Sequence, residues 1–382
     1  MLSQEHLMIR DAVRDFAERE LRPQADRIDK ESRFPREIIR KMGELGFLGI
    51  PYEERWGGSG GDNLSYMLAV EEIGRVCGST GLTLAAHVSL GTYPIWRYGT
   101  QEQKEAYLPH LVRGEYMGAF GLTEPNAGSD AGGTQSRAVR HGDSYVINGT
   151  KIWMTNGDEA GVVIMTARTS PEEEGTGGIS AFLVERGNPG MRVAKHESKL
   201  GCRGSTTVEM IFEDCRVPAG RRLGEEGNGF RMFMDTLDGG RISIGALALG
   251  IAQGAFEAAV RYAQERVQFG RPISKFQGVQ WILADMQTRI HGSRLMVYHA
   301  ARLKDAGERH KKEAAMAKLF ASETGMWVTT KAIQIFGGMG YSTEAPVERY
   351  FRDAKLMEIG EGTSEIQRNL IAREVLKELE TS

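Results

Sequence analysis

The sequence has few cysteines, little excess charge and no long apolar run. Its three cysteines, Cys77, Cys202 and Cys215, form no CxxC pair and no zinc-type spacing, so we expect a reducing compartment and no thiol or metal centre. The net charge is -3, with both signs interspersed, which argues against binding to nucleic acid or a membrane surface. No apolar run reaches the ~18 residues that a membrane-spanning helix needs. The first residues have no secretory apolar region and no Arg-rich transit pattern, so we expect a cytoplasmic protein, although a mature mitochondrial form would look the same.

Hydrophobic periodicity changes twice along the 382 residues. The first part shows amphipathic helical patterns, for example over 7–16 and 36–47. The middle part has short β-type runs, and Asn148-Gly149 predicts a hairpin turn there. In the last part, apolar residues recur at helical spacing over 244–255 and 279–290. We therefore predict an α+β fold with three domains: an all-helical N-terminal domain (1–115), a small, β-barrel-like middle domain (116–225) and a C-terminal four-helix bundle (226–382).

Glu361 is the first candidate for chemistry because it stands between two glycines, Gly360 and Gly362. The bare backbone on either side lets a ligand approach the carboxylate, and the apolar residues just upstream would resist its ionisation. These are properties of a general base. Ser364 and Gln367 have the capping-box spacing, so we expect a helix to start at Ser364. The alternative is a solvated loop carboxylate, one of 51 acidic residues.

Four further segments have functional and purely structural interpretations. Residues 120–130, FGLTEPNAGSD, could hydrogen-bond a polar ring edge or a phosphate, or form a turn-rich loop. Residues 151–157, KIWMTNG, could cover a planar cofactor with Trp153, or place that side chain in a core. Residues 334–341, QIFGGMGY, follow a helix and not a strand, so they are no Rossmann motif; their glycines cap a helix or contact a pyrophosphate. Residues 266–272 offer two arginines to phosphate or to solvent.

In this order along the chain, these motifs resemble those of the acyl-CoA dehydrogenases over essentially the whole length. GLTEPNAGSD, followed by Gly132 and Gly133, is similar to the first signature of that family. QIFGGMGYSTE, followed by Arg349 and Asp353, is similar to the second. The stretch LDGGRISIGALALGIAQGAFEAA most resembles the short-chain, butyryl-type branch.

The resemblance implies FAD bound between the subunits of a homotetramer. Leu122 and Thr123 would address the pyrimidine edge of the flavin, Trp153 to Thr155 would cover its ring and bond near N5, and residues 334–338 of a neighbouring subunit would contact the pyrophosphate and adenosine. Many relatives have Gln at the position of Glu365, where this chain departs from the family pattern. The implied FAD-binding residues are Phe120, Leu122, Thr123, Gly128, Ser129, Trp153, Met154, Thr155, Arg266, Phe269, Gln277, Gln334, Ile335, Phe336, Gly337, Gly338, Thr363, Ser364 and Glu365. The implied acyl-CoA contacts are Ser129, Asp238, Gly239, Gly240, Arg241 and Gly362.

The implied reaction is α,β-dehydrogenation of a short- to medium-chain or branched acyl-CoA to the trans-2-enoyl-CoA, with Glu361 as base and electron-transferring flavoprotein as acceptor. Some branches of the family place the base at the position of Gly240, which has no side chain here. Many straight-chain relatives have Tyr at the position of Gly360, so we expect a wider acyl pocket. The alternatives are an acyl-CoA oxidase that uses oxygen and a non-catalytic flavoprotein of the same fold.

Overall fold

The N-terminal third of the chain is helical. The computed structural model describes residues 2–380, except for the side chains of Glu172 and Glu173. Two π-helical segments, Ala17–Leu21 and His87–Thr92, interrupt the α-helices of this part. The α-helices are α1 (Gln4–Phe16), α2 (Arg22–Lys30), α3 (Arg36–Glu44), α4 (Asn63–Val76), α5 (Gly78–Ala86), α6 (Tyr93–Tyr98) and α7 (Gln101–Val112).

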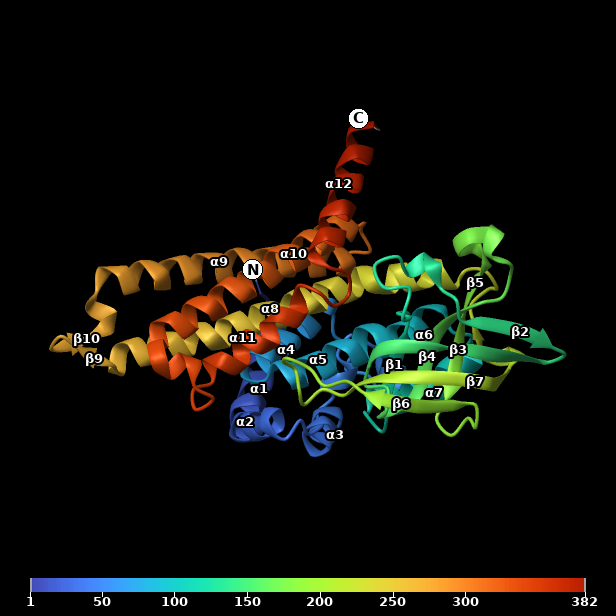
Figure 1. Ribbon diagram of the computed structural model, residues 1–382, viewed down its shortest axis with the longest axis horizontal. Helices are drawn as coiled ribbons and strands as arrows, with labels where there is room; N and C mark the ends of the chain where they lie inside the picture. The colour runs from blue at the N-terminus through green and yellow to red at the C-terminus, as the bar shows by residue number, and fades with distance from the viewer. Residues whose placement is uncertain (1, 381–382) are drawn as a thin grey trace.

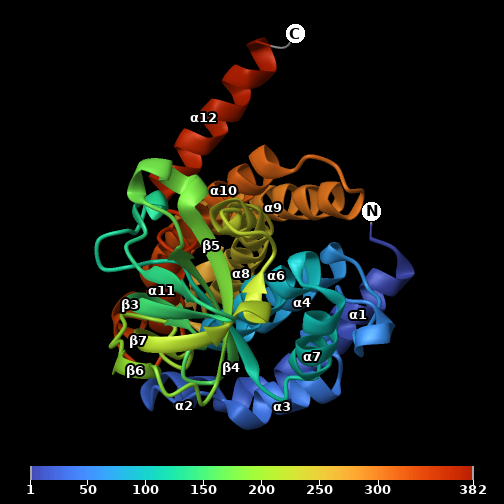
Figure 2. The same ribbon diagram turned by 90° about the vertical axis from the view of Figure 1, so that its right-hand side faces the viewer.

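A mixed eight-stranded sheet follows and forms one end of the molecule (Figures 1 and 2). Its strand order is β6-β7-β3-β2-β4-β5-β8, and β1 pairs in parallel with β4. Aromatic and β-branched side chains fill its inner face, among them Tyr145, Phe182 and Phe212. The strands are β1 (Met117–Gly121), β2 (Arg137–His141), β3 (Ser144–Thr155), β4 (Ala160–Arg168), β5 (Ile179–Glu185), β6 (Met191–His196), β7 (Thr207–Pro218) and β8 (Arg222–Leu223).

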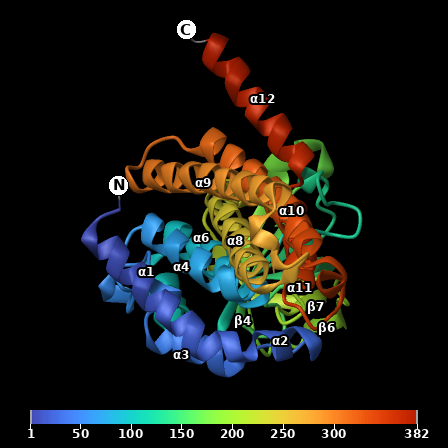
Figure 3. The same ribbon diagram turned by 90° about the vertical axis from the view of Figure 1, so that its left-hand side faces the viewer.

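The C-terminal part is a bundle of long helices, which Figure 3 shows from its open end. The 37-residue helix α8 is its axis and packs against α4, α9, α10 and α11. At Gly250, a Cβ would lie 2.3 Å from the carbonyl oxygen of Glu71, so glycine permits the close approach of α4 to α8. Helix α12 projects away from the body of the molecule. The elements are α8 (Gly229–Glu265), β9 (Val267–Gln268), β10 (Arg271–Pro272), α9 (Gln277–Asp305), α10 (Lys311–Phe336), α11 (Val347–Met357) and α12 (Ser364–Glu380).

Helix α8 is long and apolar enough to cross a membrane by length and composition alone. However, 83% of its most apolar window is buried inside the fold. Ile244, Leu247 and Ile251 on this helix are at most 2% exposed. This burial is what a core helix requires, and it accounts for the apolar composition without a membrane.

The architecture confirms the predicted α+β class with its helical, β and helical order, but two local predictions were wrong. Asn148-Gly149 is no hairpin turn, because both residues lie inside β3, at a bulge against β7. The turn between β2 and β3 is at Gly142-Asp143 instead. A Cβ at Gly149 would lie 2.2 Å from the Ser136 hydroxyl, so this glycine allows a close approach and does not make a turn. The capping box at Ser364 is the second error.

Candidate active site

Glu361 lies in a short loop between α11 and α12, in an unusual backbone conformation. Its φ is +55°, in the left-handed region that costs a non-glycine residue on the order of 1–3 kcal/mol. The following Gly362 also has a positive φ of +97°. Such a conformation persists only where the surroundings impose it. The backbone strain therefore coincides with the residue that the sequence singled out.

Helix α12 does begin at Ser364, but the predicted capping box is absent. The Ile366 amide donates to the hydroxyl of Thr363 at 3.3 Å, so Thr363 and not Ser364 is the N-cap. The Gln367 side chain points back into the loop and donates to the carbonyls of Glu361 (3.2 Å) and Gly362 (2.9 Å). The capping pattern was misread because it was one residue out of register. Gln367 instead helps to hold the loop.

The carboxylate of Glu361 lies directly against helix α8 at Gly240. A Cβ built on Gly240 would stand 2.0 Å from Glu361 Oε2 and 3.1 Å from Leu90 Cδ2. Any side chain at this position would therefore displace the carboxylate. Gly240 and Glu361, which are far apart in the sequence, share one site, so a carboxylate from either position could occupy the same space.

Burial changes the pKa of the Glu361 carboxyl group. Oε2 is buried and has no hydrogen-bond partner among the described residues, although the residue as a whole is partly exposed. Burial raises the pKa of Glu361 to about 7, while the charges of Arg241 and Lys318 act in the opposite direction. The interpretation as a solvated loop carboxylate is therefore wrong. Ile359 is 52% exposed, so the apolar surroundings come from α8 and Leu90 as well as from the residues upstream.

The two motifs of the sheet lie side by side. The Ile152 amide of β3 donates to the Thr123 carbonyl at 2.9 Å, which joins the segment after β1 to the segment with Trp153. Trp153 has φ +57° within an irregularity between β3 and β7, and its side chain is 56% exposed. The indole therefore faces outward, where it could cover a planar ligand. Met154 is fully buried, backbone included, in the core of the sheet.

A buried ion pair lies behind this surface. The Lys151 ammonium donates to Glu124 Oε1 (2.6 Å), to the Leu122 carbonyl (3.1 Å) and to the Thr166 hydroxyl (3.1 Å). Glu124 also accepts from the amide of Gln135 at 2.7 Å. The pair fixes the loop that follows β1 from inside. Lys151 stood in the second motif of the sequence, but its partners could not be read there because they come from two other segments, the loop after β1 and strand β4.

Eight of the predicted cofactor residues gather at the other end of the bundle, whereas Thr363, Ser364 and Glu365 lie where α12 begins, next to Glu361. Arg266, Phe269 and Gln277 lie between the end of α8 and the start of α9. Phe336 at the end of α10 stacks on Tyr262 of α8 with ring centroids 4.1 Å apart, which brings Gln334–Gly338 to the same end. Phe269 is 93% exposed, and a Cβ at Gly337 or Gly338 would meet no atom within 4 Å. This end offers an open surface.

The two groups of predicted FAD contacts are too far apart within one chain for one cofactor. Phe120, in the first group, stacks on Phe233 near the start of α8 with centroids 4.0 Å apart. Tyr262 marks the second group near the end of the same helix. At ~1.5 Å per residue these two α8 positions are about 44 Å apart, which is longer than a single dinucleotide. One dinucleotide could therefore not reach both groups of predicted contacts within a single chain.

The substrate residues predicted from the resemblance lie between these groups. Asp238, Gly239, Gly240 and Arg241 lie in the first half of α8, and Arg241 is 4% exposed and donates to Asp238. Gly362 lies beside Glu361 in the loop. Ser129 is exposed after β1. Helix α8 thus places the predicted acyl-CoA contacts next to the candidate base.

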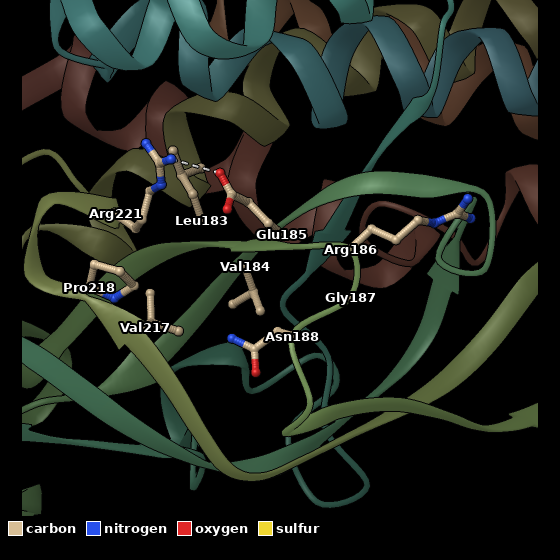
Figure 4. A pocket seen from close by; sticks show the side chains of 9 residues that line it. All are labelled: Leu183, Val184, Glu185, Arg186, Gly187, Asn188, Val217, Pro218 and Arg221. Carbon is tan, nitrogen blue, oxygen red and sulfur yellow. Dashed lines mark ion pairs between the residues drawn. The ribbon is translucent and has the colours of Figure 1, made fainter.

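A pocket on the outer β domain does not belong to this site (Figure 4). It is lined by the ends of β5 and β7, and none of its residues was predicted as a contact. Arg221 in this pocket pairs with Glu185 at 2.8 Å, and Tyr107 donates to the same carboxylate at 2.6 Å. The charges there are already satisfied by protein partners.

Comparison with family models matches the chain in three consecutive parts. Residues 3–115 match the acyl-CoA dehydrogenase N-terminal domain, residues 119–215 the middle domain and residues 227–376 the C-terminal domain. The chain belongs to the acyl-CoA dehydrogenase family. The members of this family are oxidoreductases, and the match extends over nearly the whole chain. A probable acyl-CoA dehydrogenase of Bacillus subtilis is 55% identical over 98% of this chain and 99% of its own.

Other acyl-CoA dehydrogenases are similar in sequence and structure. The short-chain-specific enzyme of Clostridium acetobutylicum is 52% identical over 98% of this chain and 99% of its own. Butyryl-CoA dehydrogenase from Megasphaera elsdenii has a TM-score of 0.96 at 46% identity, covering 98% and 99% of the two chains. A chain in a structure of the electron transferring flavoprotein of Acidaminococcus fermentans has a TM-score of 0.97 at 51% identity over 98% and 99%. A glutaryl-CoA dehydrogenase from Mycobacterium smegmatis in complex with FADH2 has a TM-score of 0.93 at 31% identity over 98% and 95%.

Lys318 was not among the residues predicted from the sequence, although its position in the helical pattern is unusual. Lys318 is fully buried in α10 and donates to the Gly362 carbonyl at 2.7 Å. It lies on the face that carries Ala314, Ala317 and Ala321, all fully buried. A lysine on the buried face of an amphipathic helix is unusual enough to be noticed in the pattern. Met316 on the same helix is 38% exposed and lies on the outer side.

Proposed function

We propose that the protein catalyses the α,β-dehydrogenation of an acyl-CoA thioester to the trans-2-enoyl-CoA, with Glu361 as the general base. The observation that carries the proposal is the Glu361 carboxylate, whose buried Oε2 lacks a partner beside Gly240. A base works best when its pKa is near the operating pH, and burial raises that of Glu361 to about 7. The 52% identity to a short-chain-specific enzyme supports the substrate class.

The chemistry needs a proton acceptor, a polarised thioester carbonyl and a hydride acceptor. Glu361 would take the α-proton of the acyl group. The backbone N–H of Glu361 would polarise the thioester carbonyl as charge develops on its oxygen. FAD, when bound, would supply the acceptor for the hydride that leaves the β-carbon. The proton goes to the carboxylate and the hydride to the cofactor, so the substrate loses two hydrogens and gains one double bond.

FAD fits the residues on the described surfaces. Trp153 offers an exposed aromatic face, and Thr123 and Thr155 offer hydroxyls beside it. The open glycines Gly337 and Gly338 leave room for a phosphate chain against the backbone. A relative at 31% identity was solved with FADH2, which supports the same cofactor here. The other proposed FAD contacts are Phe120, Leu122, Gly128, Ser129, Met154, Arg266, Phe269, Gln277, Gln334, Ile335, Phe336, Thr363, Ser364 and Glu365.

We propose a homotetramer that completes each FAD site with residues of a second subunit. The 44 Å separation of the two contact groups along α8, about 1.5 Å per residue, supports sharing between subunits. The projecting helix α12 carries Leu376 and Leu379 with exposed fractions of 61% and 71%, which a neighbouring subunit would cover. We also propose a cytoplasmic location, electron-transferring flavoprotein as the acceptor, and domain limits at 1–115, 116–225 and 226–382.

The decisive test is an anaerobic titration of the purified protein with acyl-CoA thioesters of increasing length. We expect yellow protein whose flavin absorbance bleaches with a short-chain acyl-CoA, and turnover when electron-transferring flavoprotein is added. Protein without flavin, or flavin that no acyl-CoA reduces, contradicts the proposal. Rapid release of hydrogen peroxide in air would favour the oxidase alternative.

Gly360 is proposed to widen the acyl pocket. A Cβ there would stand 3.5 Å from the Leu356 carbonyl, an ordinary contact, so crowding at Cβ does not require glycine. Gly360→Tyr should therefore fold and shift the preference towards butyryl-CoA. Turnover of wild type and variant is compared on butyryl-, isobutyryl-, isovaleryl- and octanoyl-CoA. A wild-type protein with sharp preference for butyryl-CoA would sink the idea.

A further inference from the structure

Lys318 is a buried cation without a carboxylate partner. It is 0% exposed, and no ion pair within 4.0 Å involves it among residues 2–380. Burial of an ammonium is costly, and burial lowers the pKa of Lys318 to about 8 although Glu361 opposes this. Among the described residues, its hydrogen-bond partner is the carbonyl of Gly362, at 2.7 Å. A neutral side chain could fill the same space among alanines at a lower desolvation cost.

The hydrogen bond from Lys318 goes to Gly362, the residue that directly follows the strained Glu361. Glu361 has φ +55°, and the Gly362 carbonyl that follows it accepts from Lys318 and from Gln367. Gln367 also holds the Glu361 carbonyl at 3.2 Å. Gln367 of α12 therefore holds two successive carbonyls of the loop, and Lys318 of α10 is a second donor to the later one. A hydrogen bond from a charged donor is the stronger of the two kinds.

We propose that Lys318 is a positioning residue for the base: by holding the Gly362 carbonyl, it fixes the left-handed conformation that directs the Glu361 carboxylate across Gly240. The inference rests on the proposed function, because only then is Glu361 a base. Misplacing a catalytic group by about 1 Å costs ~10²-fold in rate, so a loose loop would be felt in turnover.

The charge of Lys318 contributes a second effect. The charged groups that face Glu361 are Arg241 from α8 and Lys318 from α10, and both lower its pKa against the effect of burial. Tyr66 of α4 also senses the Glu361 charge, although burial dominates its own pKa. Without Lys318, only Arg241 of these two cations would still lower the pKa of Glu361. The pKa of Glu361 should then rise.

The test compares Lys318→Met with a control on the same helix, Lys312→Met. Lys312 pairs with Glu378 at the surface at 2.6 Å and does not contact the loop. For Lys318→Met we expect bound FAD, a KM close to wild type, a kcat lower by ~10²-fold, and a kcat/KM profile whose rising limb moves to higher pH. Hydrogen exchange of the amides of 359–364 should accelerate, while that of α8 does not. Lys312→Met should match wild type in all of these.

The following results would overturn the proposed role of Lys318. A Lys318→Met protein with wild-type kcat, pH profile and loop exchange overturns the proposal, even if its melting temperature falls. If Lys318→Met does not fold, Lys318→Gln, which keeps a polar end group, carries the same measurements. Failure of both to fold overturns the proposal in favour of a purely structural role. If wild-type flavin is not reduced by any acyl-CoA, the proposed function fails, whereas the exchange measurement still reports whether Lys318 holds the loop.

Discussion

Two carboxylates, Glu361 and Glu124, differ in how the fold treats their charge. Glu124 is 4% exposed and is fully engaged: Lys151 donates to it at 2.6 Å and the Gln135 amide at 2.7 Å. Glu361 has a buried oxygen that meets no hydrogen-bond partner within the described part of the chain. Burial raises the pKa of both, but at Glu124 the Lys151 charge and the hydrogen bonds outweigh burial, so the pKa lies below its usual value. At Glu361 burial prevails and the pKa is about 7.

The comparison separates a structural acid from a reactive one. A carboxylate whose acceptor sites are occupied gains little from taking a proton, so Glu124 can serve as a fixed anion that anchors a loop. A carboxylate that is buried but unsatisfied is ready to accept one. Burial alone therefore does not identify a base. The pattern of partners around the buried oxygens does, and each prediction below changes one member of that pattern.

The largest expected effect is the loss of turnover in Glu361→Gln. Glutamine keeps the size of the side chain but cannot accept the α-proton, and a positioned base contributes ~10²- to 10⁴-fold to the rate. We expect the variant to bind FAD and acyl-CoA as wild type does and to lose kcat by at least ~10²-fold. Stopped-flow reduction of the flavin measures the step directly. Near-normal dehydrogenation would refute the assignment.

Removing the partner of Glu124, the other carboxylate, should lower stability and not turnover. Lys151→Met leaves Glu124 buried without its cation, and breaking a buried pair from one side costs about 3–5 kcal/mol. We expect a lower melting temperature and weaker FAD retention, because Lys151 also holds the Leu122 carbonyl. Thermal unfolding and flavin release under the same conditions report both.

The double variant Lys151→Met with Glu124→Gln is the control for the unpaired charge. It removes the buried anion together with its cation, so it should recover part of the stability that Lys151→Met loses. If the single and double variants melt at the same temperature, the charge of Glu124 is not what makes the pair important.

The sequence predicted more of the chemistry than of the contacts behind it. Glu361 and the glycines beside it could be found because they are adjacent in the chain. The order of helical and β parts could also be predicted, since the period of apolar residues changes visibly. By contrast, the meeting of Glu361 with Gly240 depends on how α8 and the α11–α12 loop pack. A pattern within one segment holds no information about that distance.

The two local errors have the same origin. Asn148-Gly149 has the composition of a turn, but its glycine serves the close approach of Ser136 from another segment. Ser364 has the composition of a cap, but Thr363 one residue earlier makes the hydrogen bond. In both cases the residue types were interpreted correctly as special backbone positions. Tertiary neighbours decided which special role each one has.

Gly240→Ala tests the contact that the sequence could not show. The new Cβ would stand 2.0 Å from Glu361 Oε2, the end of a flexible side chain, so the carboxylate should move while the helix stays intact. We expect a nearly unchanged melting temperature and a kcat lower by ~10²-fold. Gly325→Ala on α10, whose Cβ would meet Ala248 at an ordinary 3.5 Å, is the control and should keep wild-type turnover. Equal kcat values in the two variants would disprove the steric argument.

The pKa values of Glu361 and Glu124 are shifted in opposite directions, so their effects depend on pH in opposite ways. Glu361 acts in its charged form, so kcat/KM should rise about tenfold per pH unit below pH 7 and level off above it. Its raised pKa also means that its contribution to stability is fully present below the unfolded pKa and is lost as the pH rises through about 7. Glu124 has a lowered pKa, so its contribution is present at neutral pH and is lost on acidification.

Melting temperatures of wild type, Glu361→Gln and Glu124→Gln between pH 5 and pH 8 separate these contributions. Glu361→Gln should gain stability relative to wild type as the pH rises, because the variant carries no charge that must stay buried without a partner. Glu124 is already ionised throughout this range because its pKa is lowered, so its titration should add no slope to the difference between Glu124→Gln and wild type, and the loss of its contribution should appear only when the series is extended below about pH 4.5. If both differences had the same sign and slope, the two carboxylates would be equivalent, and the absence of a partner at Glu361 Oε2 would have no bearing on its reactivity.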